Sequence, residues 1–130
     1  MNRVVLDASA LLAVFFDEPG AELVAPILYG ATISAVNYSE VLKKSLEKNG
    51  SLEITQGFLS RQALTIVPFE TAHAVASAAM FAQTSRVGLS FADRACVSLG
   101  LQLGYEVFTA EKRMSLTGLN VSIRLIRNAN

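Results

Sequence analysis

Short apolar runs alternate with helical stretches along the whole of this 130-residue chain. Each run is rich in β-branched or aromatic residues and too short to be a helix, which is typical of a buried strand. The runs that we expect to be strands are 3–7, 31–34, 64–67, 105–109 and 121–126. Since strands that alternate with helices pair in parallel, the sequence predicts an α/β fold with a central, mainly parallel sheet of four to five strands and helices on both faces.

The stretches between the runs carry the signals of helices and of their ends. Asp17-Glu18-Pro19-Gly20 and Asn49-Gly50 are expected to stop two of them, and Ser51 is expected to cap the next one. The Ala-rich stretch 71–84 is expected to pack closely through its small side chains. The helices that we expect are 8–16, 21–29, 35–48, 52–62, 71–84, 90–103 and 111–116.

The length and composition of the chain indicate one domain, covering residues 1–130. A chain of this length buries roughly two-thirds of the surface that it exposes when unfolded. Hydrophobic residues make up 52% of the chain and charged residues only 17%, whereas a soluble domain usually has about 25% charged residues. Either both faces of the sheet are covered, or part of the surface is covered by a partner.

The formal net charge is zero, so the chain lacks the basic character of domains that bind nucleic acid through bulk charge. Any binding of nucleic acid would have to use local patches. The single cysteine, Cys96, excludes an intrachain disulfide and fits a reducing compartment, so we expect a cytoplasmic protein. Asp7 interrupts the apolar N-terminal segment, and no apolar run is long enough to predict a membrane span.

Four acidic residues lie just past an apolar run or in the first turns of the helix that follows: Asp7, Glu40, Asp93 and Glu111. The carboxyl ends of parallel strands share one edge of a sheet, where ligands bind, so these acids can meet in one pocket. Four carboxylates in one pocket repel one another unless some take up protons or a cation neutralises them. Oxygen ligands suit Mg²⁺ or Mn²⁺, so the sequence predicts a site for one of these ions.

Each acid also has a simpler interpretation. Asp7 is placed to cap the helix that follows it, and Ser90 with Asp93 reads almost as a capping box. Glu111 in a first helical turn is stabilised by the helix dipole. Glu40 has the weakest alternative, because it lies inside a helix with apolar neighbours and an unpaired buried carboxylate is costly. Taken together, the four acids favour a metal site.

The segments around these acids resemble the PIN-domain ribonucleases, and most closely the VapC-type toxins of bacterial and archaeal toxin–antitoxin pairs. Order and spacing match over essentially the whole chain, and four segments in register are fairly specific. The matching segments are Val4-Val5-Leu6-Asp7-Ala8-Ser9-Ala10-Leu11-Leu12, Ser39-Glu40-Val41-Leu42, Leu89-Ser90-Phe91-Ala92-Asp93-Arg94-Ala95 and Val107-Phe108-Thr109-Ala110-Glu111.

The resemblance implies roles for individual residues. Asp7, Glu40 and Asp93 fall on the metal-binding acids of the family, and Ser9 and Thr109 fall on its hydroxyl residues beside the first and fourth acids. The family commonly has Asp where this chain has Glu111. The Glu side chain is one methylene longer, and Mg²⁺ tolerates little geometric error, so Glu111 either binds a metal through water, serves only a second ion or has lost the role.

The function that the resemblance implies is Mg²⁺- or Mn²⁺-dependent endoribonuclease, in the manner of a VapC-type toxin. RNA would be hydrolysed by in-line attack of a metal-activated water on a phosphodiester. Members of the family usually form homodimers and are silenced by a cognate antitoxin protein that packs on apolar helices. We therefore expect an RNA substrate, a homodimer and an antitoxin partner, and no association with a membrane.

Several other polar residues are candidates for supporting roles. Asn37 lies three residues before Glu40 on the same helical face and is either its partner or a solvated side chain. Cations that flank the acids in sequence would bind phosphate oxygens or simply balance nearby charge; they are Arg86, Arg94, Lys112 and Arg113. Residues read as structural are His73, Cys96 and the three lysines near a helix C-terminus, Lys43, Lys44 and Lys48.

Two other functions remain open at this stage. One is a phosphotransferase or phosphatase with Asp7 as nucleophile, although the haloacid-dehalogenase pattern has a second Asp where this chain has Ser9. The other is a catalytically silent PIN-like module that binds RNA or protein, which the Glu at position 111 favours.

Overall fold

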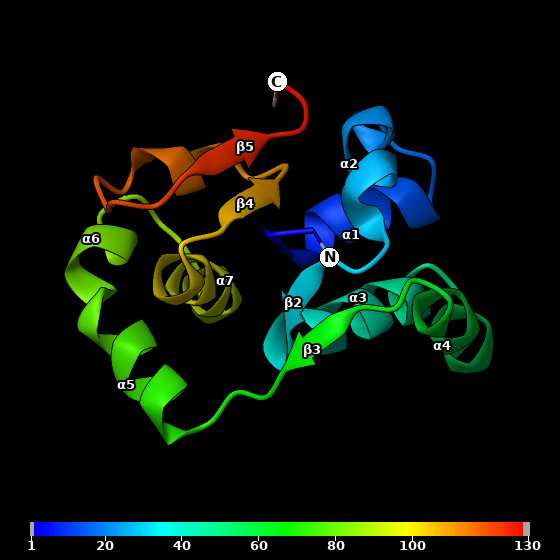
Figure 1. Cartoon of the computed structure of the whole chain (residues 1–130), viewed down its shortest axis with the longest axis horizontal. Helices are drawn as coiled ribbons and strands as arrows, with labels where there is room; N and C mark the ends of the chain where they lie inside the picture. The colour runs from blue at the N-terminus through cyan, green and yellow to red at the C-terminus, as the bar shows by residue number, and fades with distance from the viewer. Residues whose placement is uncertain (1, 129–130) are drawn as a thin grey trace.

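The computed structural model describes residues 2–128 and contains one sheet of five strands. All neighbouring strands are parallel, and their order across the sheet is β3-β2-β1-β4-β5 (Figure 1). The predicted α/β class and the parallel sheet are confirmed, with strands shorter by one to three residues than the sequence suggested. Their bounds are β1 Val4–Leu6, β2 Thr32–Ser34, β3 Thr65–Val67, β4 Glu106–Thr109 and β5 Ile123–Leu125.

Strand β1 lies in the middle of the sheet and is the centre of the core. Val5 pairs with Thr32 on one side and with Val107 on the other. Neither Val5 nor Leu6 has any exposed surface, and the two side chains join different apolar clusters. Because successive side chains of a strand point to opposite faces, this continuous apolar run is buried on both faces of the sheet.

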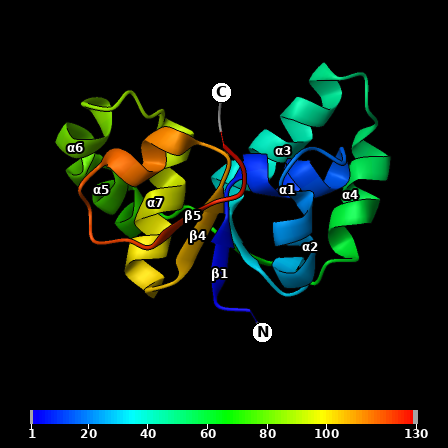
Figure 2. The ribbon, with the colours of Figure 1, turned by 90° about the horizontal axis from the view of Figure 1, so that it is seen from above.

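The helices form two layers, one on each face of the sheet, as Figure 2 shows. Leu6, Ile33 and Phe108 pack with one layer, and Val5 and Val107 pack with the other. The first layer contains α1 Ala8–Phe15, α2 Ala21–Leu28, α3 Ala35–Glu47 and α4 Leu52–Ser60. The second contains α5 Thr71–Ala79, α6 Phe81–Ser85, α7 Phe91–Leu103 and the 3₁₀ helix η1 Lys112–Leu116.

The Ala-rich stretch differs from its prediction. A single helix over 71–84 was expected, but the chain turns at Met80, which has φ −97° and ψ 17° and is buried among residues of the second layer. The turn carries this side chain into the core and separates α5 from α6. The expected close packing of the small side chains is borne out where α5 lies against α7, although Ser77 is the only buried residue of α5.

Helix α7 lies directly against β4 because one of its residues has no side chain. A Cβ built on Gly100 would stand 2.4 Å from Cγ2 of Val107 and 3.4 Å from the carbonyl oxygen of Tyr105. Real Cβ atoms do not approach other atoms so closely, so any larger residue would push the helix away from the strand. The absence of a methyl group therefore sets the distance between α7 and the sheet.

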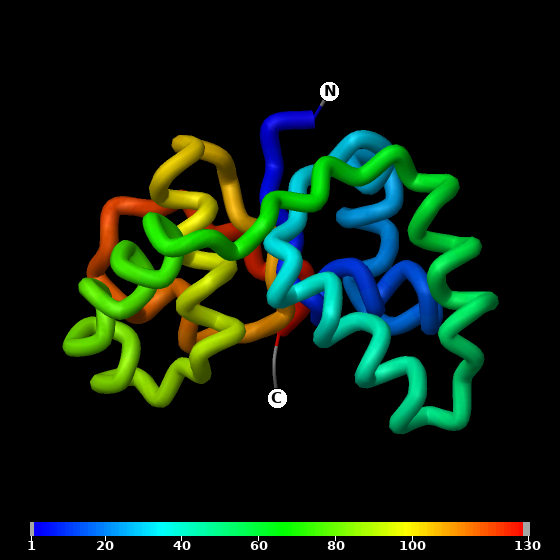
Figure 3. The backbone as a smooth tube through the Cα atoms, turned by 90° about the horizontal axis from the view of Figure 1, so that it is seen from below, coloured from blue at the N-terminus to red at the C-terminus, as the bar shows by residue number. Residues whose placement is uncertain are grey.

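The parallel arrangement gives the molecule two different edges, which Figure 3 shows with the two chain ends on opposite sides. The carboxyl ends of β1, β2 and β4 reach the same edge, and α1 and α3 begin there. Within residues 2–128, no helix is both long and apolar enough to cross a membrane. Asp7 and Glu111 come just after strands at the carboxyl edge, Asp93 lies in the first turn of α7, and Glu40 lies in the second turn of α3.

Candidate active site

Asp7 follows β1 directly and is the N-cap of α1. Its Oδ1 accepts hydrogen bonds from the backbone N–H of Ala10 at 2.9 Å and from the hydroxyl of Ser9 at 2.7 Å. Its Oδ2 accepts a hydrogen bond from the hydroxyl of Thr109 at 2.5 Å. Only 4% of the residue is exposed, so this carboxylate is a helix cap that is also buried at the carboxyl edge of the sheet.

Burial raises the pKa of the Asp7 carboxyl from 3.8 to about 6. The hydrogen bonds from Thr109, Ser9 and Ala10 favour the charged form and lower the pKa, but they do not offset the loss of hydration. The charge of Asp93 raises the pKa further. Asp7 is therefore a carboxylate that a nearby cation would stabilise strongly.

Thr109 stands beside Asp7 because β1 and β4 pair with Leu6 opposite Phe108. Its hydroxyl donates to Asp7 and accepts a hydrogen bond from the backbone N–H of Glu111 at 2.8 Å. The hydroxyl of Ser9 likewise accepts from the backbone N–H of Ala110 at 2.9 Å while donating to Asp7. Two hydroxyl groups thus connect the end of β1 to the loop that follows β4.

Asp93 lies in the first turn of α7 and forms a capping box with Ser90. Its Oδ2 accepts from the backbone N–H of Ser90 at 3.0 Å, and its own N–H donates to the hydroxyl of Ser90 at 3.2 Å. Cys96, one turn further along the helix, is fully buried. Burial raises the pKa of the Cys96 thiol well above its usual value, and the charges of Asp7, Asp93 and Glu40 raise it further, so these three acids surround one point of the fold.

Glu40 is connected to α7 through Asn37, which is 1% exposed. The Nδ2 of Asn37 donates to Oε1 of Glu40 at 3.3 Å and to the backbone carbonyl of Ala92 at 3.1 Å. Since both bonds go to acceptors, they fix which end of the amide is nitrogen. The buried Oδ1 of Asn37 then has no hydrogen-bond partner among residues 2–128. An oxygen that is buried and unpaired beside these acids suits a cation or a water molecule bound to one.

Glu111 is paired with Arg113 rather than with the other acids. Its two oxygens accept from Nη2 of Arg113 at 2.6 Å and from Nε at 3.1 Å, and Oε2 also accepts from the backbone N–H of Arg113 at 2.9 Å. These contacts hold the pKa of Glu111 below its usual value. The Nη1 of Arg113 donates to the carbonyl of Gly88 at 3.1 Å, which ties this pair to the loop before Asp93.

In residues 2–128, no three His, Cys, Asp or Glu side chains stand ready to enclose a metal ion. That is compatible with Mg²⁺, which usually binds one or two carboxylates and keeps several of its water molecules. Asp7 and Asp93 supply such a pair, and the charge of Asp93 raises the pKa of Asp7. The donor set is made of oxygen atoms alone, and it fits a hard divalent cation held partly through water.

A family model of the PIN domain matches residues 4–118, which includes all four acids. The chain belongs to the PIN domain family. Nucleases of this family generally use divalent metal ions, in keeping with the oxygen donors of the site. No curated protein matches the sequence.

Solved structures of PIN domains share the fold of this chain at low sequence identity. A toxin–antitoxin complex from Klebsiella pneumoniae is 16% identical, with a TM-score of 0.77 over 97% of this chain and 99% of that one. DNA-bound VapBC from Salmonella typhimurium is 19% identical, with a TM-score of 0.74 over 98% and 100%. VapBC-1 from nontypeable Haemophilus influenzae is 13% identical, with a TM-score of 0.71 over 95% and 97%. At such identities the likeness shows the fold alone.

The cations near the acids in sequence occupy different places in this PIN domain. Arg94 lies against the ring of Phe81, with its guanidinium carbon 5.8 Å from the ring centre, and Lys112 is exposed. Arg86 donates to the carbonyls of Leu116 and Thr117 and so ties α6 to η1. Arg113, through its contacts with Glu111 and Gly88, is the cation best placed beside Asp93.

His73 has the structural place that the sequence suggested. Its Nδ1 accepts a hydrogen bond from the backbone N–H of Glu70 at 3.1 Å, as part of the capping box of α5. Lys43 forms an ion pair with Glu47 at 3.6 Å on the surface of α3. Neither residue points to chemistry.

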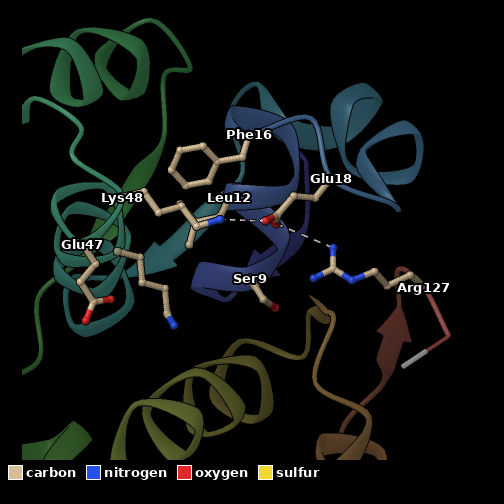
Figure 4. Close-up of a pocket in the computed structure, with 8 residues that line it drawn as sticks. Ser9, Leu12, Phe16, Glu18, Glu47, Lys48 and Arg127 are labelled. Atoms are coloured by element: carbon tan, nitrogen blue, oxygen red, sulfur yellow. Dashed lines mark hydrogen bonds and ion pairs between the residues drawn. The ribbon is translucent and has the colours of Figure 1, made fainter. Parts of the chain in front are cut away.

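Sequence reasoning missed a pocket of about 270 Å³ that opens beside Ser9 (Figure 4). Its lining comes from α1, the loop after α1, α3 and the segment after β5, and consists of Ser9, Leu12, Phe16, Glu18, Lys44, Glu47, Lys48 and Arg127. Part of it was visible in the sequence, since Lys44 and Lys48 lie one and two turns beyond Glu40. Nothing in the sequence indicated that Glu18 and Arg127 would meet there.

Proposed function

We propose that this PIN domain is a metal-dependent endoribonuclease that hydrolyses RNA phosphodiester bonds, in the manner of a VapC-type toxin. The observation that carries the proposal is the environment of Asp7. A carboxylate that is buried at the carboxyl edge of a parallel sheet, with its pKa raised to about 6 and Asp93 nearby, is an unfavourable group unless a cation completes it.

Asp7 and Asp93 are the proposed metal ligands, with Glu40 and Glu111 contributing directly or through water. Bound Mg²⁺ or Mn²⁺ supplies a water of lowered pKa and offsets the charge of the phosphate. Ser9 and Thr109 orient Asp7 by donating to its two oxygens. Asn37 holds the Glu40 carboxylate against α7.

The phosphate itself is the proposed partner of cations around the site. Arg113 has five N–H donors, and three of them are used by Glu111 and Gly88. The other two N–H groups are accessible to a phosphate, since 51% of the side chain is exposed. Arg94 and Lys112 are proposed to contribute more weakly, as point charges on either side of the metal.

Exposed apolar side chains on the helices are the basis for the proposed protein partners. Large apolar side chains are exposed in both helical layers, including Tyr29 at 68%, Ile54 at 68%, Val75 at 65% and Phe81 at 60%. Exposed apolar side chains of this size suit association with other chains. We propose a homodimer and a cognate antitoxin as the chains that cover them, in a cytoplasmic protein. The similar structure from Klebsiella pneumoniae is named as a toxin–antitoxin complex, which supports the antitoxin.

The test is cleavage of a structured RNA by the purified protein, with and without metal. Cleavage should stop in EDTA, return with Mg²⁺ or Mn²⁺, and be weak with Ca²⁺, which is larger and activates water poorly. An Asp93→Asn variant, prepared side by side and shown to be folded, controls for contaminating ribonucleases. RNA cleavage that persists in EDTA, or that the Asp93→Asn variant retains, would falsify the nuclease proposal.

The ion pair of Glu111 with Arg113 favours one alternative, a catalytically silent module that binds RNA or protein. A fourth acid that is neutralised by an arginine is not free to serve a metal ion. Thermal melting with several millimolar Mn²⁺ separates the two functions at the level of metal binding, since a ligand of the folded state raises Tm. The nuclease requires such a shift and its loss in a variant carrying both Asp7→Asn and Asp93→Asn.

A further inference from the structure

The pocket beside Ser9 is a groove between α1 and α3, and its lining includes the hydroxyl partner of Asp7. On α1, Ser9, Leu12 and Phe16 follow one another at intervals of three and four residues and so lie on one face. On α3, Lys44 and Lys48 follow Glu40 at intervals of four, each about 6 Å further along the helix. The groove thus leads from Asp7, which Ser9 contacts at 2.7 Å, toward Lys48.

The groove combines an apolar wall with cations. Leu12 is buried and Phe16 half-buried, and Nζ of Lys48 lies 4.4 Å from the centre of the Phe16 ring. Lys44 is exposed, and its side chain forms no ion pair or hydrogen bond with any residue in 2–128. Lys48 is the lysine beside the ring, and Lys44 is the unpaired one. A groove that offers both cations and an aromatic ring suits single-stranded nucleic acid, whose phosphates take the charges and whose bases stack on the ring.

One carboxylate holds the two other cations of the groove. Glu18 lies between Lys48 and Arg127, as Figure 4 shows, at 3.3 Å and 3.9 Å from their nitrogen atoms. Arg127 also donates to the carbonyl of Pro19 at 2.7 Å. The close approach of the Arg127 segment to the Glu18 loop depends on Gly20, where a Cβ would stand 2.6 Å from the carbonyl oxygen of Ile126.

We propose that this groove binds the RNA strand next to the bond that is cut, with Lys44, Lys48 and Arg127 on its phosphates and a base against Leu12 and Phe16. The inference rests on the proposed nuclease function and gives it a strand direction along α3. Glu18 opposes this binding, because its charge repels phosphate and occupies two of the three cations. A chain of zero net charge would then bind RNA through a local patch rather than through bulk charge.

The test uses the affinity of the full chain for a fluorescein-labelled single-stranded RNA of mixed sequence, measured by anisotropy with Ca²⁺ in place of Mg²⁺. Lys44→Met should weaken binding roughly threefold to tenfold and lower the slope of log affinity against log salt by about 0.7, the value for one phosphate contact on a single strand. Arg61→Met is the matched control, because Arg61 is exposed, ends α4 near the amino edge and loses the same charge. It should change neither quantity beyond the general effect of net charge.

Glu18→Gln gives a second result of opposite sign. Loss of the Glu18 charge releases Lys48 and Arg127, so RNA binding should tighten severalfold and the salt slope should steepen. If Glu18 has only a structural role, RNA binding should be weaker or unchanged. Glu106→Gln is its control, since Glu106 pairs with Arg124 at 3.7 Å at the start of β4, away from the groove.

The groove is overturned if wild-type protein does not bind the RNA, if Lys44→Met and Arg61→Met bind alike, or if Glu18→Gln weakens binding. These outcomes are distinct from failure of the nuclease proposal. If cleavage survives EDTA, the proposed metal chemistry is wrong, but the RNA affinities of Lys44→Met and Arg61→Met still test the groove. If Lys44→Met and Arg61→Met bind the RNA equally well, the groove proposal is wrong even if cleavage requires Mg²⁺.

Discussion

Asp7 and Glu111 follow two neighbouring parallel strands, yet their carboxyl groups are held in opposite ways. Asp7 is buried and receives only neutral donors, and its pKa rises to about 6. Glu111 is partly exposed and paired with a guanidinium, and its pKa falls. The difference teaches that position at a strand end does not decide whether an acid is available to a metal; what else neutralises its charge does.

The largest expected effect is loss of activity in Asp7→Asn. The amide preserves the cap and most hydrogen bonds but removes the buried charge, so RNA cleavage should fall by at least about a hundredfold, the scale of losing one preorganised charge-stabilising group. Folding should be retained by circular dichroism. Glu22→Gln, at an exposed position in the first turn of α2, is the control and should cut like wild type. Full activity in Asp7→Asn would remove Asp7 from the site.

The stability of the metal-free protein should depend on pH with opposite signs at the two acids. Folded Asp7 holds its proton up to about pH 6, whereas the unfolded chain releases it near 3.8, so the folded state binds more protons between these values. The free energy of unfolding therefore falls as pH rises through this window, by about 3 kcal/mol for a shift of about two units. Urea unfolding in EDTA at pH 4 and pH 7.5 measures it, and Asp7→Asn should lack this fall.

Glu111 should contribute in the reverse sense. Its pKa is lowered from 4.5 in the folded chain, so its stabilising contribution is present above about pH 4.5 and is lost as the pH falls through the lower folded value. Comparing wild type with Glu111→Gln over the same pH range isolates this term. A difference between the two that grows in acid would contradict the pairing with Arg113.

Thr109→Val should break the connection between the two acids. The Thr109 hydroxyl is fully buried, donates to Asp7 and accepts from the backbone N–H of Glu111, so valine leaves both groups without this partner. We expect a loss of about 1–3 kcal/mol in the free energy of unfolding at pH 7.5, the usual cost of an unsatisfied buried polar group. Thr109→Ser, which restores the hydroxyl, should recover most of the loss; equal stability of all three proteins would show that the bridge contributes nothing.

The smallest effect is expected at Glu111 itself. Glu111→Gln removes the charge and Glu111→Asp shortens the side chain, so both lose the two-pronged contact with Arg113 and should lower cleavage about tenfold, as for residues that position a metal site from outside it. Arg113→Lys should behave similarly. Higher activity in Glu111→Asp would instead mean that this position serves the metal directly and that an Asp reaches it better.

Much of the fold followed from local patterns, because the central strands are continuous apolar runs between clear helix ends. The gathering of the acids at one edge followed from parallel pairing alone. The turn at Met80 could not be foreseen, since neither glycine nor proline marks it and burial of one side chain decides it. The Ala-rich pattern indicated the close approach of α5 to α7 but not that most residues of α5 would be exposed, since small residues are compatible with both.

Details of the candidate site depended on contacts that no local pattern carries. The bond from Thr109 to Asp7 needs the register of β1 against β4, which strands of three and four residues do not encode in their sequence. The pairing of Glu111 with Arg113 occurs two residues apart at the start of a 3₁₀ helix, a spacing that does not bring side chains together on a regular α-helix. The contact of Glu18 with Arg127 joins the loop after α1 to the segment after β5, which are far apart in the sequence.

Because Gly100 has no side chain, α7 lies close to β4, and this contact determines the position of Asp93 on the same helix. Replacing glycine by alanine inside a helix ordinarily adds about 0.5–1 kcal/mol of stability, and a consensus-minded protein engineer would choose it. Here the new methyl would meet Val107 at 2.4 Å and force the helix outward, carrying Asp93 with it two turns away. A thermostabilising programme that treats this glycine as an ordinary helix defect would thus displace an acid of the proposed metal site without touching any residue in that site.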